Sequence, residues 1–109
     1  MAAQDTTWKH DKVFPLIARV IAAEFQQRQR FITSREIADA LLRDAEARRI
    51  IDGVVQQRGR DSTPKHTAIN MVAWFSQRIT AKQSEWQSRF ERTRIDRQYA
   101  YKPAATPAT

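Results

Sequence analysis

The chain has 109 residues, enough for one small domain with a modest core. It carries 19 Lys and Arg against 12 Asp and Glu, and the resulting formal net charge of +7 suggests a polyanionic partner, nucleic acid before others. The lack of cysteine excludes disulfides and thiolate metal sites. No apolar run has the length of a signal-peptide core or a membrane span, so we expect a soluble, cytoplasmic protein.

A helix is expected in the first quarter of the chain, after a disordered lead at residues 1–7. It should begin between Trp8 and Pro15 and end near Arg28. Pro15 belongs near the start, because deeper in the helix its ring would remove a hydrogen bond. The apolar residues at helical spacing are Val13, Phe14, Ile17, Val20, Ile21 and Phe25.

The clearest local signal is a capping box. Thr33 is the expected cap and Glu36 lies three residues later, so a helix should begin at Ser34. The preceding pair, Phe31–Ile32, is expected to be extended and could form a first β-strand. The buried side of this helix is expected to consist of Ile37, Ala38, Leu41 and Leu42.

The segment 44–57 also has a helical pattern, with Ile50, Ile51, Val54 and Val55 apolar. Gly53 lies inside this segment, where glycine is less favourable to a helix than alanine by about 1 kcal/mol. Either 34–57 is one bent helix or it is two helices. Residues 58–62 then form a turn, with Gly59 as the expected C-terminal cap.

A further helix is predicted from Thr63, whose hydroxyl can cap it, with Pro64 at the first helical position. Its apolar stripe is Ala68, Met71, Val72, Phe75 and Ile79. At about 100° per residue the opposite face consists of Thr63, His66, Asn70, Ala73 and Gln77. That face has no acidic residue and suits base edges in a DNA groove, although an ordinary amphipathic helix would also have a polar outer face.

The C-terminal part favours a β-hairpin over residues 90–102. Asp96-Arg97 would form the turn, and Tyr99 and Tyr101 would lie on one face, across from Arg94 and Arg92. Just before it, Trp86 and Phe90 fit either a short helix or a strand. Residues 103–109 are expected to be a disordered tail.

The order of these elements resembles the winged helix-turn-helix family of DNA-binding domains. Residues 31–38 look like the entry into the second helix of such a domain, 63–80 like its recognition helix and 90–102 like its wing. The resemblance implies a single domain at 8–102 with a mainly helical α+β fold, in which a bundle of three to four helices carries a C-terminal wing.

One departure from the family is the spacing before the recognition helix. About twenty residues separate Leu42 from Thr63, where a typical member has a short turn. Either an extra helix is inserted, or 44–57 and 63–80 are themselves the helix-turn-helix pair.

The resemblance implies a recognition helix in the major groove and a wing on a neighbouring minor groove or the backbone. The expected base contacts are Lys65, His66, Thr67 and Asn70. The expected backbone contacts are Arg58, Arg60, Thr63, Arg92, Arg94 and Arg97. The plainer alternatives are a solvated Asn70 and a His66 that donates to a nearby carbonyl.

We therefore expect sequence-specific binding of double-stranded DNA, by a small transcriptional regulator or a mobile-element accessory protein. A homodimer could form through the first helix or Trp74. The rival hypothesis is a winged-helix module for protein–protein interaction or dimerisation, since a fold does not fix a function. DNA is favoured if the arginines at 58, 60, 92, 94 and 97 converge with Lys65. RNA is a third possibility, because the hairpin tyrosines could stack bases.

Catalysis is not expected. The two histidines, His10 and His66, lie in different segments, and no glycine-rich phosphate loop or spaced carboxylate pair is present. The acidic residues Asp39, Asp44 and Glu46 fit solvated helix positions. No cofactor, metal or small-molecule ligand is expected.

Overall fold

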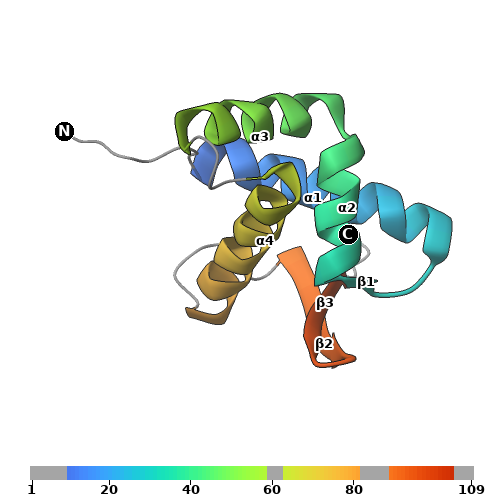
Figure 1. The fold of residues 1–109 in the computed structure, drawn as a ribbon. Coiled ribbons are helices and arrows are strands. Elements are labelled where there is room, and N and C mark those ends of the chain that lie inside the picture. The colour runs from blue at the N-terminus through green and yellow to red at the C-terminus, as the bar shows by residue number, and fades with distance from the viewer. Residues whose placement is uncertain (1–9, 59–62, 82–88, 105–109) are drawn as a thin grey trace.

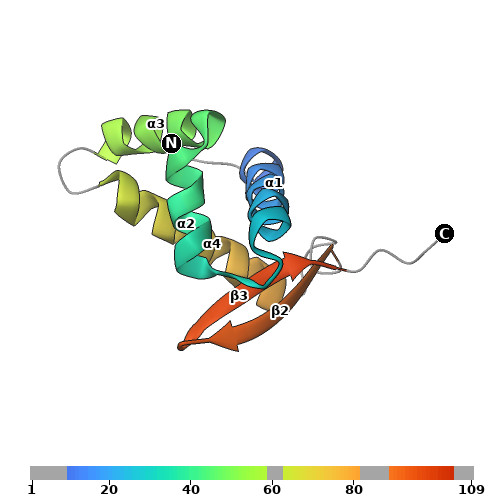
Figure 2. The same cartoon turned by 90° about the vertical axis from the view of Figure 1, so that its right-hand side faces the viewer.

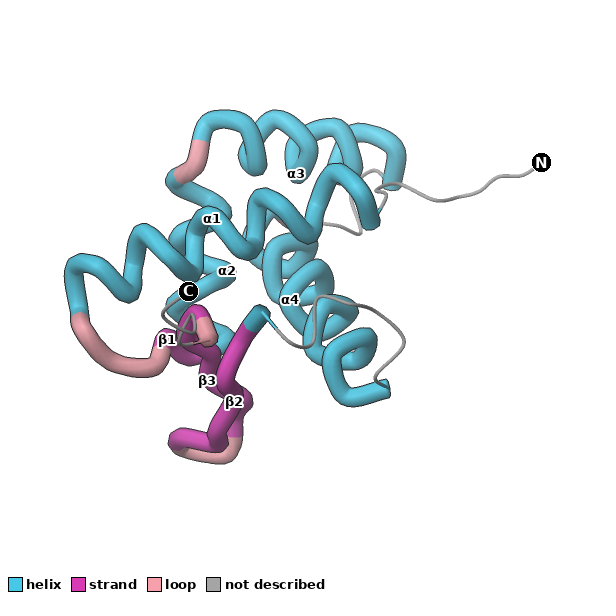
Figure 3. Tube along the Cα trace, turned by 180° about the vertical axis from the view of Figure 1, so that it is seen from behind, coloured by secondary structure: helices cyan, strands magenta, loops and turns pink. Residues whose placement is uncertain are grey.

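The computed structural model describes residues 10–58, 63–81 and 89–104. In chain order the elements are α1 (His10–Arg28), β1 (Ile32–Thr33), α2 (Ser34–Arg43), α3 (Ala45–Arg58), α4 (Pro64–Ala81), β2 (Phe90–Ile95) and β3 (Gln98–Pro103). Figure 1 shows α3 at one end and the strands at the other, with α2 and α4 running between them. Seen from behind, α1 crosses the molecule between α3 and the sheet (Figure 3). The expected mainly helical α+β fold is confirmed.

The strands form one antiparallel sheet with the order β1-β3-β2. The expected hairpin is present, and its register pairs Arg94 with Tyr99 and Arg92 with Tyr101, as the sequence indicated. A first strand is present, at Ile32–Thr33 rather than Phe31–Ile32, but the sequence did not predict its pairing with the hairpin, in which Ile32 lies opposite Tyr101. The hairpin is thereby tied to the start of α2.

The sheet also extends beyond the expected end of the hairpin. Pro103, where a disordered tail was expected to begin, still pairs with Phe90. One residue later, the Ala104 N–H donates to the Arg89 carbonyl at 2.9 Å.

The core lies among the four helices and the inner face of the sheet, with Ala47, Ile51 and Val54 as the contribution of α3. The predicted apolar stripe of α4 is confirmed, because all five residues are buried. At its centre, the Phe75 ring meets the rings of Phe14, Phe90 and Tyr101 edge-on, with centroids 5.2, 5.3 and 5.2 Å away. The Tyr101 hydroxyl donates to Ser76 Oγ at 2.8 Å. Burial raises the pKa of this phenol, despite the Ser76 hydrogen bond, which acts in the opposite direction.

The segment 34–57 forms two helices, which meet at Asp44. This residue is extended (φ −82°, ψ 126°), and its carboxylate accepts the Ala47 N–H at 2.9 Å, which caps α3. The same carboxylate binds the Arg19 guanidinium at 2.7 and 2.8 Å. Partial burial alone would raise the pKa of Asp44, but these hydrogen bonds outweigh it and the pKa is lowered. The expectation of a merely solvated Asp44 is wrong, because the residue joins α1 to the start of α3.

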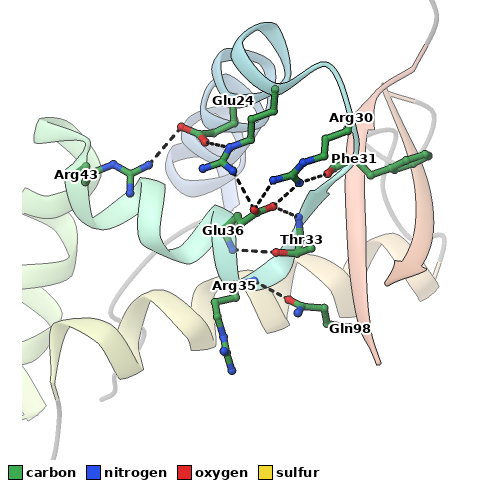
Figure 4. Close-up of polar contacts among 9 residues, drawn as sticks. Glu24, Arg30, Phe31, Thr33, Arg35, Glu36, Arg43 and Gln98 are labelled. Carbon is green, nitrogen blue, oxygen red and sulfur yellow. Dashed lines mark hydrogen bonds and ion pairs between the residues drawn. The ribbon is translucent and has the colours of Figure 1, made fainter. Parts of the chain in front are cut away.

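The capping box at the start of α2 is confirmed. The Glu36 N–H donates to Thr33 Oγ1 at 3.2 Å, and the Thr33 N–H donates to the Glu36 carboxylate at 3.0 Å. Figure 4 shows the Arg30 guanidinium directed at the same carboxylate, which it binds at 2.7 Å. Arg28 Nη1 also binds this carboxylate, at 3.0 Å. The Arg30 hydrogen bond, with the Thr33 N–H and the two positive charges, lowers the pKa of Glu36 to about 2.

No helix in the described part of the chain is both long and apolar enough to cross a membrane.

We expect Glu36 to make the free energy of unfolding depend on pH in the acidic range. Its carboxylate has a pKa of about 2 in the folded chain and about 4.5 when unperturbed, so its contribution should be full above pH 4.5 and disappear toward pH 2. Glu36→Gln keeps a side chain suited to a capping box but removes the charge. Urea unfolding of both proteins from pH 6 to pH 2 should give free energies that converge as the pH falls. A constant difference would contradict the assignment.

Gly53 offers a second test of the fold. It lies within α3, is exposed, and a Cβ atom there would meet nothing within 4 Å. Gly53→Ala should therefore stabilise the protein by about 1 kcal/mol, since glycine loses more backbone freedom in a helix. Thermal unfolding should show a Tm higher by roughly 4–8 °C. Gly53→Ser should gain less, and an unchanged Tm for Gly53→Ala would count against a helical residue at 53.

Candidate nucleic-acid interface

The start of α4 is built as the sequence predicted. The helix begins at Pro64, and Thr63 Oγ1 accepts the His66 N–H at 3.1 Å. Lys65 and His66 are exposed, and Asn70 is half-buried. Thr67 differs from expectation, because it is only 2 % exposed and cannot offer its side chain to a base. It precedes Ala68 of the apolar stripe directly, so the packing of α4 covers it.

The hairpin turn places a cation at an exposed tip. Asp96 and Arg97 both have positive φ, at 52° and 68°, as a two-residue type I′ turn requires. Such a turn normally contains glycine or asparagine, because other residues are strained there. Arg97 is exposed at this position.

Two further arginines extend from the strand before the turn. The guanidinium groups of Arg92 and Arg94 lie over the Tyr99 ring, 4.3 and 5.4 Å from its centroid. Such cation–π contacts fix the directions of long side chains. On the same face, Phe90 and Tyr101 pack into the core. One face of the hairpin is thus apolar at its base and cationic toward its tip.

A groove of about 800 Å³ separates the hairpin from α4. Its α4 wall is mainly apolar, with Ile69, Val72 and Ala73, and Tyr99 lines the hairpin side. Arg35 and Arg97 also line the groove, one from the start of α2 and one from the turn. In Figure 2 the start of α4 lies close to α3 on the left, and the hairpin tip lies at the lower edge of the molecule.

Two hydrogen bonds hold the hairpin against the start of α2. The Ser34 hydroxyl donates to the Tyr99 carbonyl at 2.7 Å, and the Arg35 N–H donates to Gln98 Oε1 at 2.9 Å. In Figure 4 the Arg35 side chain points away from the Glu36 carboxylate. Sequence reasoning missed Arg35, because only the sheet pairing brings it to the hairpin.

Some of the described cations form ion pairs and others, including Lys12 of α1 and Arg49 of α3, do not. On α1–α3 and the segment between α1 and β1, five arginines form ion pairs with carboxylates: Arg19, Arg28, Arg30, Arg43 and Arg48. Within the described ranges, the structure gives no ion pair for Arg35, Lys65, Arg94 or Arg97. Their charge remains available to a partner.

Two of the four cations Arg35, Lys65, Arg94 and Arg97 line the groove, and the other two are close to residues that line it. Arg35 and Arg97 line it, Arg94 lies over groove-lining Tyr99, and Lys65 lies one helical turn before Ile69 on α4. Two other expected contacts, Arg60 and the side chain of Arg58, lie outside what the structure describes.

Trp74 does not lie on the groove. It is half-buried and meets Phe14 of α1 edge-on with centroids 5.0 Å apart, and Arg78 lies 5.9 Å from its ring centroid. It closes the core between α4 and α1. Among the described residues, no three histidine or acidic side chains are grouped so as to hold a metal.

Comparison of the chain with protein-family models, curated proteins and solved structures finds no match.

Arg97→Gly should stabilise the protein by about 1 kcal/mol, because glycine adopts a φ of 68° without strain. Thermal or urea unfolding measures the change. The matched control is Thr93→Gly, which places glycine in an extended strand and should lower stability. If both variants were destabilised alike, the left-handed turn would be wrong.

Proposed function

We propose that this protein binds double-stranded DNA as a winged helix-turn-helix domain, with α4 in the major groove and the β2–β3 hairpin as the wing. The main support is a group of cations in and near the groove between these elements. Within the described residues none of them has a carboxylate partner: Arg35, Lys65, Arg94 and Arg97. Phosphates attract such charges and release counterions on contact. A small transcriptional regulator or a mobile-element accessory protein is the role we propose for it.

The chain topology supports this assignment. The ring contacts of Phe75 with Phe90 and Tyr101 hold the hairpin against the helix that precedes it in the chain, as a wing requires. Among the helices, α4 has its most extensive contact with α2. This favours α2 and α4 as the helix-turn-helix pair, with α3 inserted between them.

In the proposed complex, α4 and the hairpin have different roles. Lys65, His66 and Asn70 face base edges from the first turns of α4, and the positive end of the helix dipole lies near phosphate. Arg92, Arg94 and Arg97 grip the backbone or a minor groove. Thr63, Arg58 and Arg60 complete the proposed phosphate contacts.

One observation favours a second candidate, the docking of an acidic protein segment. The α4 wall of the groove is apolar, and arginines lie at its edges. An amphipathic acidic peptide would complement such a groove. The DNA hypothesis is preferred because the cations also continue along the hairpin face.

The test is binding to a random-sequence duplex by fluorescence anisotropy across a salt series. We expect the logarithm of affinity to fall linearly with the logarithm of salt concentration. The double variant Arg94→Ala/Arg97→Ala should weaken binding and reduce the slope by about 1.8, at 0.9 for each lost phosphate contact. Circular dichroism would verify that the variant is folded.

The matched control is Lys12→Ala/Arg49→Ala. These residues line a separate hollow between α1 and α3, and their replacement removes the same charge. The control should keep the wild-type slope. Equal losses in both variants would indicate a general charge effect, and no binding at low salt would reject the DNA hypothesis in favour of a protein partner.

A further inference from the structure

The outward face of α4 is an uncharged strip that we call the reading strip. It consists of His66, Ile69, Asn70, Ala73 and Gln77, which recur at helical spacing. All five are exposed or half-buried. Among the described residues, Ile69 is the one large apolar side chain that is exposed, at 45 %. The strip therefore offers amides, an imidazole and two alkyl groups, while the cations lie beside it.

The chemistry of this strip matches one class of base pair. Asparagine and glutamine can bond adenine through N6 and N7, and alkyl side chains contact the C5-methyl group of thymine. Guanine is read chiefly by arginine or lysine, and among the proposed base contacts only Lys65, which lies outside the strip, is of this kind. A single exposed isoleucine is ordinary on a protein surface. Here it is followed by Ala73 on the same side and bordered by amides, and this combination is complementary to A·T pairs.

We propose that α4 selects A·T base pairs, with Asn70 and Gln77 bonding adenine and with Ile69 and Ala73 covering thymine methyl groups. The inference rests on the proposed function and names the DNA that it would prefer. Asn70 and Gln77 are seven residues apart, or about 10 Å along the helix axis. This corresponds to about three base steps of 3.4 Å. The preferred site therefore contains a short run of A·T pairs.

The deciding experiment compares three duplexes of equal length and charge by fluorescence anisotropy. The first alternates adenine and thymine, the second has deoxyuridine in place of thymidine, and the third alternates guanine and cytosine. The second duplex lacks only the methyl groups. Wild-type protein should bind the thymine duplex roughly fourfold more tightly than the uracil duplex for each methyl group that it covers. The guanine–cytosine duplex should bind more weakly than the thymine duplex.

Two variants assign the preference to residues. Ile69→Ser/Ala73→Ser should bind the thymine and uracil duplexes with equal affinity. Asn70→Ala should lose less affinity than wild-type protein on a duplex with 7-deazaadenine, which lacks the N7 acceptor, because only Gln77 then bonds adenine. All three substituted residues are exposed or half-buried, so the folded variants can be compared directly.

The outcomes separate the two proposals. If wild-type protein binds all three duplexes equally, the A·T preference is overturned and DNA binding stands. If it binds none of them at low salt, the proposed function fails, and this inference fails with it.

Discussion

The pairing of β1 with β3 is the constraint on which the arrangement of the groove depends. It involves two residues of β1, Ile32 and Thr33, paired with Tyr101 and Ala100. A two-stranded hairpin is marginally stable alone, and a third strand with a buried face makes it a stable sheet. Because α2 begins directly after β1, the same pairing also sets the position of the hairpin relative to α2. The groove and its two bordering arginines follow from that single junction.

Local features of the fold could be predicted from the sequence. The capping box needs only Thr33 and Glu36, and the stripe of α4 needs only its own spacing. The register of the hairpin followed from a two-residue turn. The contacts between segments could not be predicted, since Ser34 and Tyr99 lie 65 residues apart and no local pattern in either segment identifies the other. The role of Asp44 was missed for the same reason, because Arg19 is 25 residues away.

At the candidate site, too, local features could be predicted from the sequence and contacts between distant segments could not. Periodicity was sufficient to place Lys65, His66 and Asn70 away from the apolar stripe. It failed for Thr67, which lies at the edge of that stripe, where packing rather than angle decides exposure. Composition predicted a net positive charge but not which cations would remain without carboxylates. That sorting depends on the fold, which surrounds Glu36 with arginines and leaves Arg35, its neighbour in the sequence, directed to the groove.

The paired register of the hairpin limits how its length can change. Successive strand residues point to opposite faces, and the two-residue turn sets the register, so inserting one residue into β2 would exchange the faces of every residue between the start of the strand and the insertion. With an insertion after Thr93, Glu91 and Thr93 would take the face that now carries Arg92, and an acidic group would join a surface that is now cationic. Insertions of two residues would preserve the alternation. The hairpin can therefore reach further from the body of the molecule only in steps of one residue pair.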